Sequence, residues 1–104
     1  MILEDGTGLA NSNSYASEDT LETYADDRGI TLATGDAEAA LVRATAWIDM
    51  TYRGRFSGSR VNGRDQALEW PRINVYDNSG DAVADAEVPT ESVSATCEAA
   101  IREL

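Results

Sequence analysis

Three oxygen-bearing side chains at alternate positions, Asp77, Ser79 and Asp81, have the spacing that begins a calcium-binding loop. Such a loop needs a glycine at its sixth position and a glutamate at its twelfth, but this chain has Ala82 and Val88 there. One position turns the loop and the other completes the coordination of the ion. Because both are lost, we predict a plain turn here and no metal site.

Trp70 lies close to two cations, Arg64 and Arg72, and an aromatic ring among arginines can stack the bases of single-stranded DNA. Tyr52, Phe56 and Tyr76 are further aromatic residues that such a platform could use. The alternative is that Trp70 and Trp47 are core anchors beneath a polar loop. We favour the core interpretation, because a DNA-binding domain usually presents a net basic face and this chain is strongly acidic.

Several other kinds of chemistry lack their usual residues. The sequence contains no histidine, which removes the commonest general base and metal ligand, and Cys97 is the only cysteine. Gly6-Thr7-Gly8 does not fit a nucleotide-binding loop, and the adjacent Asp26 and Asp27 have no histidine or lysine beside them. We therefore predict a protein that is not an enzyme and needs no cofactor or metal. No apolar run is long enough to cross a bilayer and the first residues do not fit a signal peptide, so we expect no membrane association and a cytoplasmic location.

Charge is distributed unevenly along the chain. Its 104 residues carry 19 acidic and 8 basic side chains, a formal net charge of −11. Residues 53–72 hold five arginines against two acids, and the segments on either side are acidic. Because opposite charges steer association and fix register, we predict that these arginines contact an acidic neighbour, with a solvated loop as the alternative. We call them the basic girdle: Arg53, Arg55, Arg60, Arg64 and Arg72.

Apolar periodicity predicts helices near residues 17–28, 36–52 and 89–104. Ser17 is a suitable N-cap for the first helix, Gly29 can end it, and Pro89 suits the first turn of the last helix. We predict a mainly α fold, a single domain built as a bundle of about three helices. Its expected core is Leu21, Tyr24, Leu41, Trp47, Ile48, Val93, Cys97 and Ile101.

The remaining segments lack helical periodicity. We expect an extended arm over residues 1–13, a long basic loop over 53–65 that projects from the bundle, and a short hairpin near 73–84 that turns at 77–80. Pro71 holds Trp70 in an extended conformation, and we take both as structural anchors together with Trp47 and Pro89. The apolar face of the last helix still continues at Leu104, so we expect a longer natural protein.

The order of several motifs resembles a family of phage head–tail connector (adaptor) proteins, some members of which are described as DnaT-like single-stranded-DNA-binding proteins. The matching stretches are EDGTG and NSY near the start, SEDTLETYADDRG (17–29), AALVRATAWID (39–49), QALEWPR (66–72), and an Asp–Gly turn followed by Val88-Pro89. Known members usually extend tens of residues past the last helix, and no such tail is present here.

The resemblance implies a structural subunit of the virion neck. Twelve copies would form a homo-oligomeric ring between the portal protein and the stopper or tail completion protein, and DNA would pass through the lumen. A head-to-tail interface that closes gives a ring, and an acidic lumen would repel phosphates in transit. The alternative is a DnaT-like replication accessory protein that binds single-stranded DNA. The basic girdle and the N-terminal arm are our candidates for assembly contacts, on the charge pattern alone.

Overall fold

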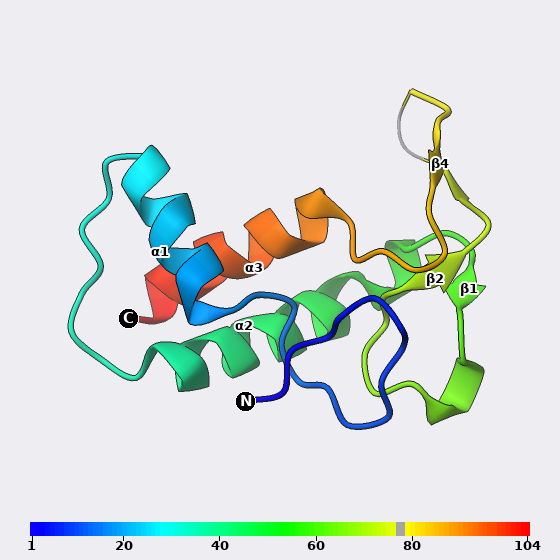
Figure 1. Ribbon diagram of the computed structural model, residues 1–104, viewed down its shortest axis with the longest axis horizontal. Helices are drawn as coiled ribbons and strands as arrows, with labels where there is room; N and C mark the ends of the chain where they lie inside the picture. Colours follow the sequence, from blue (N-terminus) through cyan, green and yellow to red (C-terminus); the bar gives the residue numbers. More distant parts are fainter. Residues whose placement is uncertain (77–78) are drawn as a thin grey trace.

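The fold is a three-helix layer with short strands gathered at one end, as seen in a computed structural model that describes residues 1–76 and 79–104. The helices are α1 (Glu18–Asp27), α2 (Ala37–Tyr52) and α3 (Thr90–Glu103). Figure 1 shows α2 and α3 side by side, with α1 near the C-terminal end of α3 and the strands at the opposite end. The predicted helix-rich fold and the three predicted helices are confirmed.

The helix ends follow from local sequence. The Ser17 hydroxyl accepts a hydrogen bond from the Thr20 amide at 3.1 Å, which satisfies an amide that the first turn leaves unpaired. Gly29 adopts a φ of 66°, and the amide of Ile30 donates to the carbonyl of Ala25 at 2.9 Å. This is the geometry of a Schellman ending, so the predicted start and end of the first helix are both confirmed.

The helices meet in a core built largely of small side chains. Leu21 of α1, Leu41 of α2 and Cys97 of α3 are fully buried there, and the alanines between them let the helix axes approach closely. Tyr24, Val93 and Ile101 are partly buried against this cluster, and Ile48 is buried farther along α2. The prediction for these seven residues is therefore confirmed in outline.

Trp47 is the exception, because 52% of its surface is exposed. The α2 helix buries a second face that includes Thr45 and Asp49, and the segments around Tyr15 and Glu69 cover that face. The buried side of α2 therefore includes Thr45 and Asp49 and does not include Trp47. The assignment of Trp47 as a core anchor was wrong. Apolar periodicity identifies only the apolar face of a helix, and here loops also bury a polar face.

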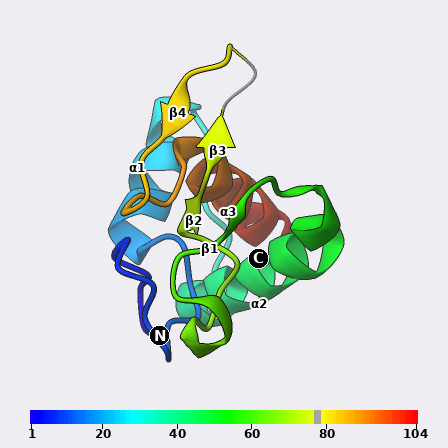
Figure 2. The same cartoon turned by 90° about the vertical axis from the view of Figure 1, so that its right-hand side faces the viewer.

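Within the described parts of the chain, four two-residue strands form two antiparallel pairs. The first pair joins β1 (Ser59–Arg60) to β2 (Arg72–Ile73), and the second joins β3 (Val75–Tyr76) to β4 (Ala82–Val83). Figure 2 looks onto this end of the molecule, where β3 and β4 extend away from the helices. The predicted hairpin is confirmed by the pairing of Val75 with Val83. Part of its predicted turn, residues 77–78, lies outside the described residues.

The basic loop predicted over residues 53–65 is held against the molecule and does not project. It contains two short 3-10 turns, η1 (Arg53–Arg55) and η2 (Gly63–Asp65), with β1 between them. Phe56 packs edge-on against Trp70 with their ring centroids 5.2 Å apart, and the second apolar cluster forms around this contact. The pairing partner of β1 lies more than ten residues away in sequence, which a local turn signal cannot reveal.

Residues 1–13 also differ from the predicted extended arm. The Glu4 carboxylate is buried and accepts hydrogen bonds from the amides of Gly6, Gly8 and Leu9 at 2.9–3.0 Å, and from the Ser12 hydroxyl at 2.9 Å. The segment therefore folds into a closed loop around one side chain. Two glycines with positive φ allow the backbone to turn its amides inward toward that charge.

Candidate functional site

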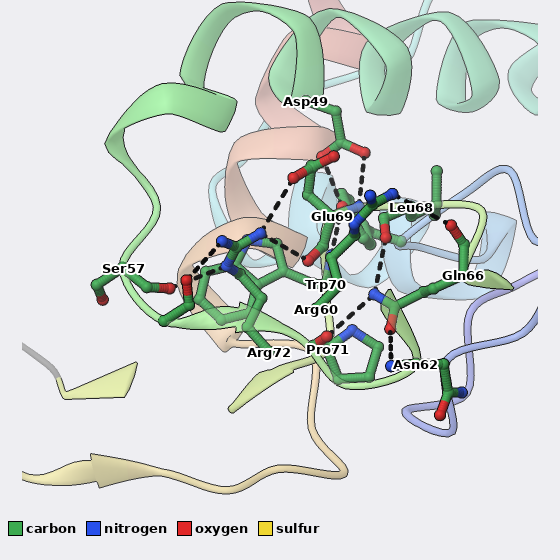
Figure 3. Close-up of polar contacts among 12 residues, drawn as sticks. Asp49, Ser57, Arg60, Asn62, Gln66, Leu68, Glu69, Trp70, Pro71 and Arg72 are labelled. Atoms are coloured by element: carbon green, nitrogen blue, oxygen red, sulfur yellow. Dashed lines mark hydrogen bonds and ion pairs between the residues drawn. The ribbon is translucent and has the colours of Figure 1, made fainter. Parts of the chain in front are cut away.

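The Trp-Pro-Arg segment (residues 70–72), which belongs to one of the stretches that resemble the family, is directed into the protein (Figure 3). Arg72 is 7% exposed. Its guanidinium donates to the carbonyls of Ser57 and Gly58 at 2.9 and 3.0 Å and pairs with the Glu69 carboxylate at 3.0 Å. Because Ser57 and Gly58 precede β1 and Arg72 begins β2, these hydrogen bonds hold the turn before β1 against β2. Arg72 is thus occupied inside the fold and is not available for contacts with other molecules.

Gln66 organises the other side of the same segment. Its side-chain amide donates to the carbonyls of Leu68 and Pro71 at 2.7 and 3.0 Å, and its oxygen accepts from the Asn62 amide at 3.2 Å. The two carbonyls that Gln66 contacts come before and after the cis peptide bond between Trp70 and Pro71 in the chain. Pro71 is fully buried, as expected for an anchor, and Pro89 is buried just before α3.

Tyr15, Asp49 and Trp70 connect the N-terminal loop, α2 and the Trp-Pro-Arg segment. The Tyr15 hydroxyl donates to the Asp49 carboxylate at 2.6 Å and accepts from the Trp70 amide at 3.2 Å. The other Asp49 oxygen accepts from the Glu69 amide at 3.1 Å. Burial raises the pKa of Asp49, while the bonds from Tyr15 and Glu69 act to lower it. Burial, with Asp49 beside it, also raises the pKa of Tyr15 well above its ordinary value.

The structure separates the members of the basic girdle. Arg53 and Arg55 are exposed on η1, and Arg64 is exposed on η2. Arg60 is half-buried on β1, where it makes a long contact of 3.5 Å to the Gln66 carbonyl. With Arg72 inside the fold, three exposed arginines on two different turns remain for contacts with other molecules.

An open groove of about 560 Å³ lies between α2 and α3. One wall is aromatic, because Trp47 and Tyr52 pack edge to face with centroids 5.9 Å apart and Phe56 follows them. Ala95 and Ala99 of α3 provide small apolar surface between the walls. The groove therefore presents apolar surface that the helices do not cover.

The α3 wall of the groove is acidic. Glu91, Glu98 and Glu103 line it, with Arg102 as the single basic lining residue. Glu98 lies 3.7 Å from Arg102, and Glu103 pairs with Arg43 at 2.8 Å. Glu91 is exposed and forms no ion pair with any arginine of the chain, all of which are described. An occupant would meet an aromatic wall on one side and unpaired negative charge on the other.

The structure does not support a stacking platform at Trp70. The ring is 5% exposed and packs against Phe56, so bases cannot reach it. The preference for a core role is confirmed for Trp70. Trp47 and Tyr52 are instead the accessible aromatic pair beside cations, since the Arg55 guanidinium lies 5.9 Å from the centre of the Tyr52 ring.

The remaining candidate chemistry gains no support. Among the described residues, no cluster of three or more acidic, cysteine or histidine side chains could hold a metal ion. The calcium-like spacing includes Asp77, which lies outside the described residues. Within residues 1–76 and 79–104, no helix has the length and apolar character needed to cross a bilayer.

Sequence reasoning missed the side chains that organise the loops, above all Glu4 and the Tyr15–Asp49 pair. Glu4 gave a usable signal, because an acid followed by closely spaced glycines can be surrounded by its own backbone amides. Tyr15 and Asp49 are more than thirty residues apart and gave none. The exposure of Trp47 also gave no signal, because its position is compatible with the apolar face of α2.

Comparison with known proteins gives one family. A model for the family described as "Putative DnaT-like ssDNA binding protein" matches residues 1–104. No curated protein and no solved structure matches the chain. The family description mentions single-stranded DNA and does not mention a connector, so it agrees with the DnaT-like part of the expected resemblance.

Proposed function

The chain belongs to this DnaT-like family. From the order of its sequence motifs and its acidic charge, and not from the family description, we propose that it is a non-enzymatic structural subunit of a phage head–tail connector. In this role it would assemble with copies of itself between the portal and the stopper or tail completion protein, around DNA in transit. The proposed site of action is the neck of the virion. The order of sequence motifs that suggested this role spans most of the chain.

The observation that carries the proposal is the inward orientation of the Trp-Pro-Arg segment within a strongly acidic molecule. Trp70 and Arg72, the side chains best suited to bind a base and a phosphate, are both buried and hold the fold together. A net charge of −11 repels phosphate groups. This combination suits a subunit past which DNA must move, because retained phosphates would slow its passage.

The first test is particle shape together with native mass. We expect the purified chain, or the chain mixed with a portal protein from a phage that encodes a family member, to form annular particles visible by negative-stain electron microscopy. Light scattering should give a mass that is an integral multiple of 11.2 kDa. A chain that stays monomeric alone and with portal would contradict the proposal.

Single-stranded-DNA binding is the second candidate, and the family description together with one surface favours it. Trp47 and Tyr52 are accessible, and Arg53 and Arg55 follow directly on η1. Aromatic rings beside arginines can stack bases while the cations contact the backbone. This surface is displaced from the one that the sequence suggested.

Salt dependence separates the two candidates. If the chain binds single-stranded DNA, a labelled oligo-dT should bind with an affinity that falls steeply with salt, with a logarithmic slope of about −0.7 for each phosphate contacted. The double variant Arg53→Ala/Arg55→Ala should then bind more weakly, and Arg64→Ala on the other turn is the matched control. For a connector subunit, fluorescence anisotropy should show no saturable binding at 0.15 M salt.

A further inference from the structure

We infer that the groove between α2 and α3 is a docking site for a cationic amphipathic helix from a different protein. The inference rests on the proposed connector role, in which the chain joins unlike proteins, and it adds the chemistry of one such partner. Nothing in the assignment to the DnaT-like family specifies this surface or what binds there.

The shape of the groove fits a helix. Its α3 wall runs from Glu91 to Glu103, which is about 18 Å at the rise of an α-helix. An apolar helix face set into such a groove is a common mode of recognition, with side chains at helical spacing as anchors. Trp47, which lines the groove and is half-exposed, is an aromatic residue of the kind that often dominates binding energy.

Charge identifies the occupant more closely. The acids that line the groove outnumber its single arginine, and Glu91 has no arginine partner. The molecule as a whole is also strongly acidic. Lysine or arginine side chains flanking an apolar stripe would therefore be attracted at long range and paired at close range.

A helix from a second copy of the chain does not meet this requirement. Each of the helices α1, α2 and α3 carries more acidic than basic side chains. The charge complementarity thus favours a partner of different sequence.

The probe is a fluorescein-labelled peptide of about fourteen residues, with leucines at helical spacing and lysines elsewhere, titrated into the folded chain at 0.15 M salt. We expect saturable binding with one peptide per chain. Trp47→Ala should weaken binding at least tenfold. Met50→Ala is the matched control, because Met50 is 68% exposed on the same helix outside the groove lining, and it should change affinity less than twofold.

A second pair of variants tests the acidic wall. Glu91→Gln should weaken binding several-fold, whereas Glu87→Gln, an exposed acid outside the groove, should not. A peptide with glutamate in place of lysine should fail to bind. Equal affinities for the Trp47 and Met50 variants would overturn the inference, because the peptide would then be held only by the general acidic field.

Two further outcomes would overturn the named occupant. Self-association of the wild-type chain that Trp47→Ala abolishes would assign the groove to a second copy. Displacement of the peptide by oligo-dT would assign it to nucleic acid. Ring formation is measured separately, so rings without groove binding refute only this inference, and groove binding without rings refutes only the connector role.

Discussion

At the scale of single residues, Tyr15 joins three segments through one hydroxyl group. That hydroxyl satisfies both the Asp49 carboxylate and the Trp70 amide. Tyr15→Phe leaves two buried polar groups without their partner, so we expect a loss of about 1–3 kcal/mol in the free energy of unfolding at pH 7. Urea denaturation measures it. Tyr52→Phe is the control, since no hydrogen bond of the Tyr52 hydroxyl is seen among the described residues.

The same substitution has a predictable pH dependence. Because burial raises the pKa of Asp49 above 3.8, its ionisation opposes folding, and stability from this group falls as pH rises through the folded-state pKa. Removing the Tyr15 bond raises that pKa further. The Tyr15→Phe penalty should therefore be smaller near pH 4 than at pH 7. A penalty that grew on acidification would contradict this assignment.

Arg72 and Arg64 provide a matched pair of arginines with opposite environments. Arg72 is buried among backbone carbonyls, whereas Arg64 is exposed on η2. Arg72→Ala removes the donor to the Glu69 carboxylate and to three backbone carbonyls, so we expect a loss of about 3 kcal/mol. Arg64→Ala should stay within about 0.5 kcal/mol of wild type. Similar losses in both variants, measured by chemical denaturation, would show that the carbonyl contacts of Arg72 contribute little.

At the scale of elements, the turn before β1 depends on Gly58. Its φ is 71°, and an added Cβ would lie 1.9 Å from the carbonyl oxygen of Ile73. Gly58→Ala should therefore separate β1 from β2 and destabilise the protein by more than about 2 kcal/mol. Gly63→Ala has a similar positive φ of 56° but open space around it, so its cost should be near 1 kcal/mol. Thermal melts of the two variants distinguish steric conflict from backbone strain.

The elements that sequence predicted best are those fixed by local signals. The caps at Ser17 and Gly29 and the apolar spacing of the helices needed only nearby residues to be recognised. The packing of the 53–65 segment could not be predicted in this way, because it depends on Phe56 meeting Trp70 and on β1 meeting β2. For the candidate site, the charge pattern predicted contacts at all five arginines of the basic girdle, and this stays a prediction; the structure exposes Arg53, Arg55 and Arg64 but buries Arg72. The exposure of Trp47 depended on which loops cover α2.

At the scale of the whole molecule, the excess of acidic charge opposes compaction. With a net charge of −11 over 104 residues, folding brings like charges closer together. Raising NaCl from about 0.02 M to 0.5 M shortens the screening length several-fold, so we expect the melting temperature to rise by several degrees. Sucrose at equal osmolality controls for solute exclusion. A lower melting temperature in salt would mean that the ion pairs, such as Arg43–Glu103, outweigh the repulsion.

The two tryptophans lie in opposite environments, 5% exposed at Trp70 and 52% exposed at Trp47. Their intrinsic fluorescence should therefore resolve into two optical signals. The Trp70 emission should be blue-shifted and resist quenching by acrylamide until the chain unfolds. The Trp47 emission should be red-shifted and readily quenched in the native state, and a ligand in the groove would shield it. The intrinsic fluorescence of an unlabelled sample can thus report both folding and the binding of a ligand in the groove. In the Trp47→Phe variant, only the Trp70 emission, which reports folding, should remain.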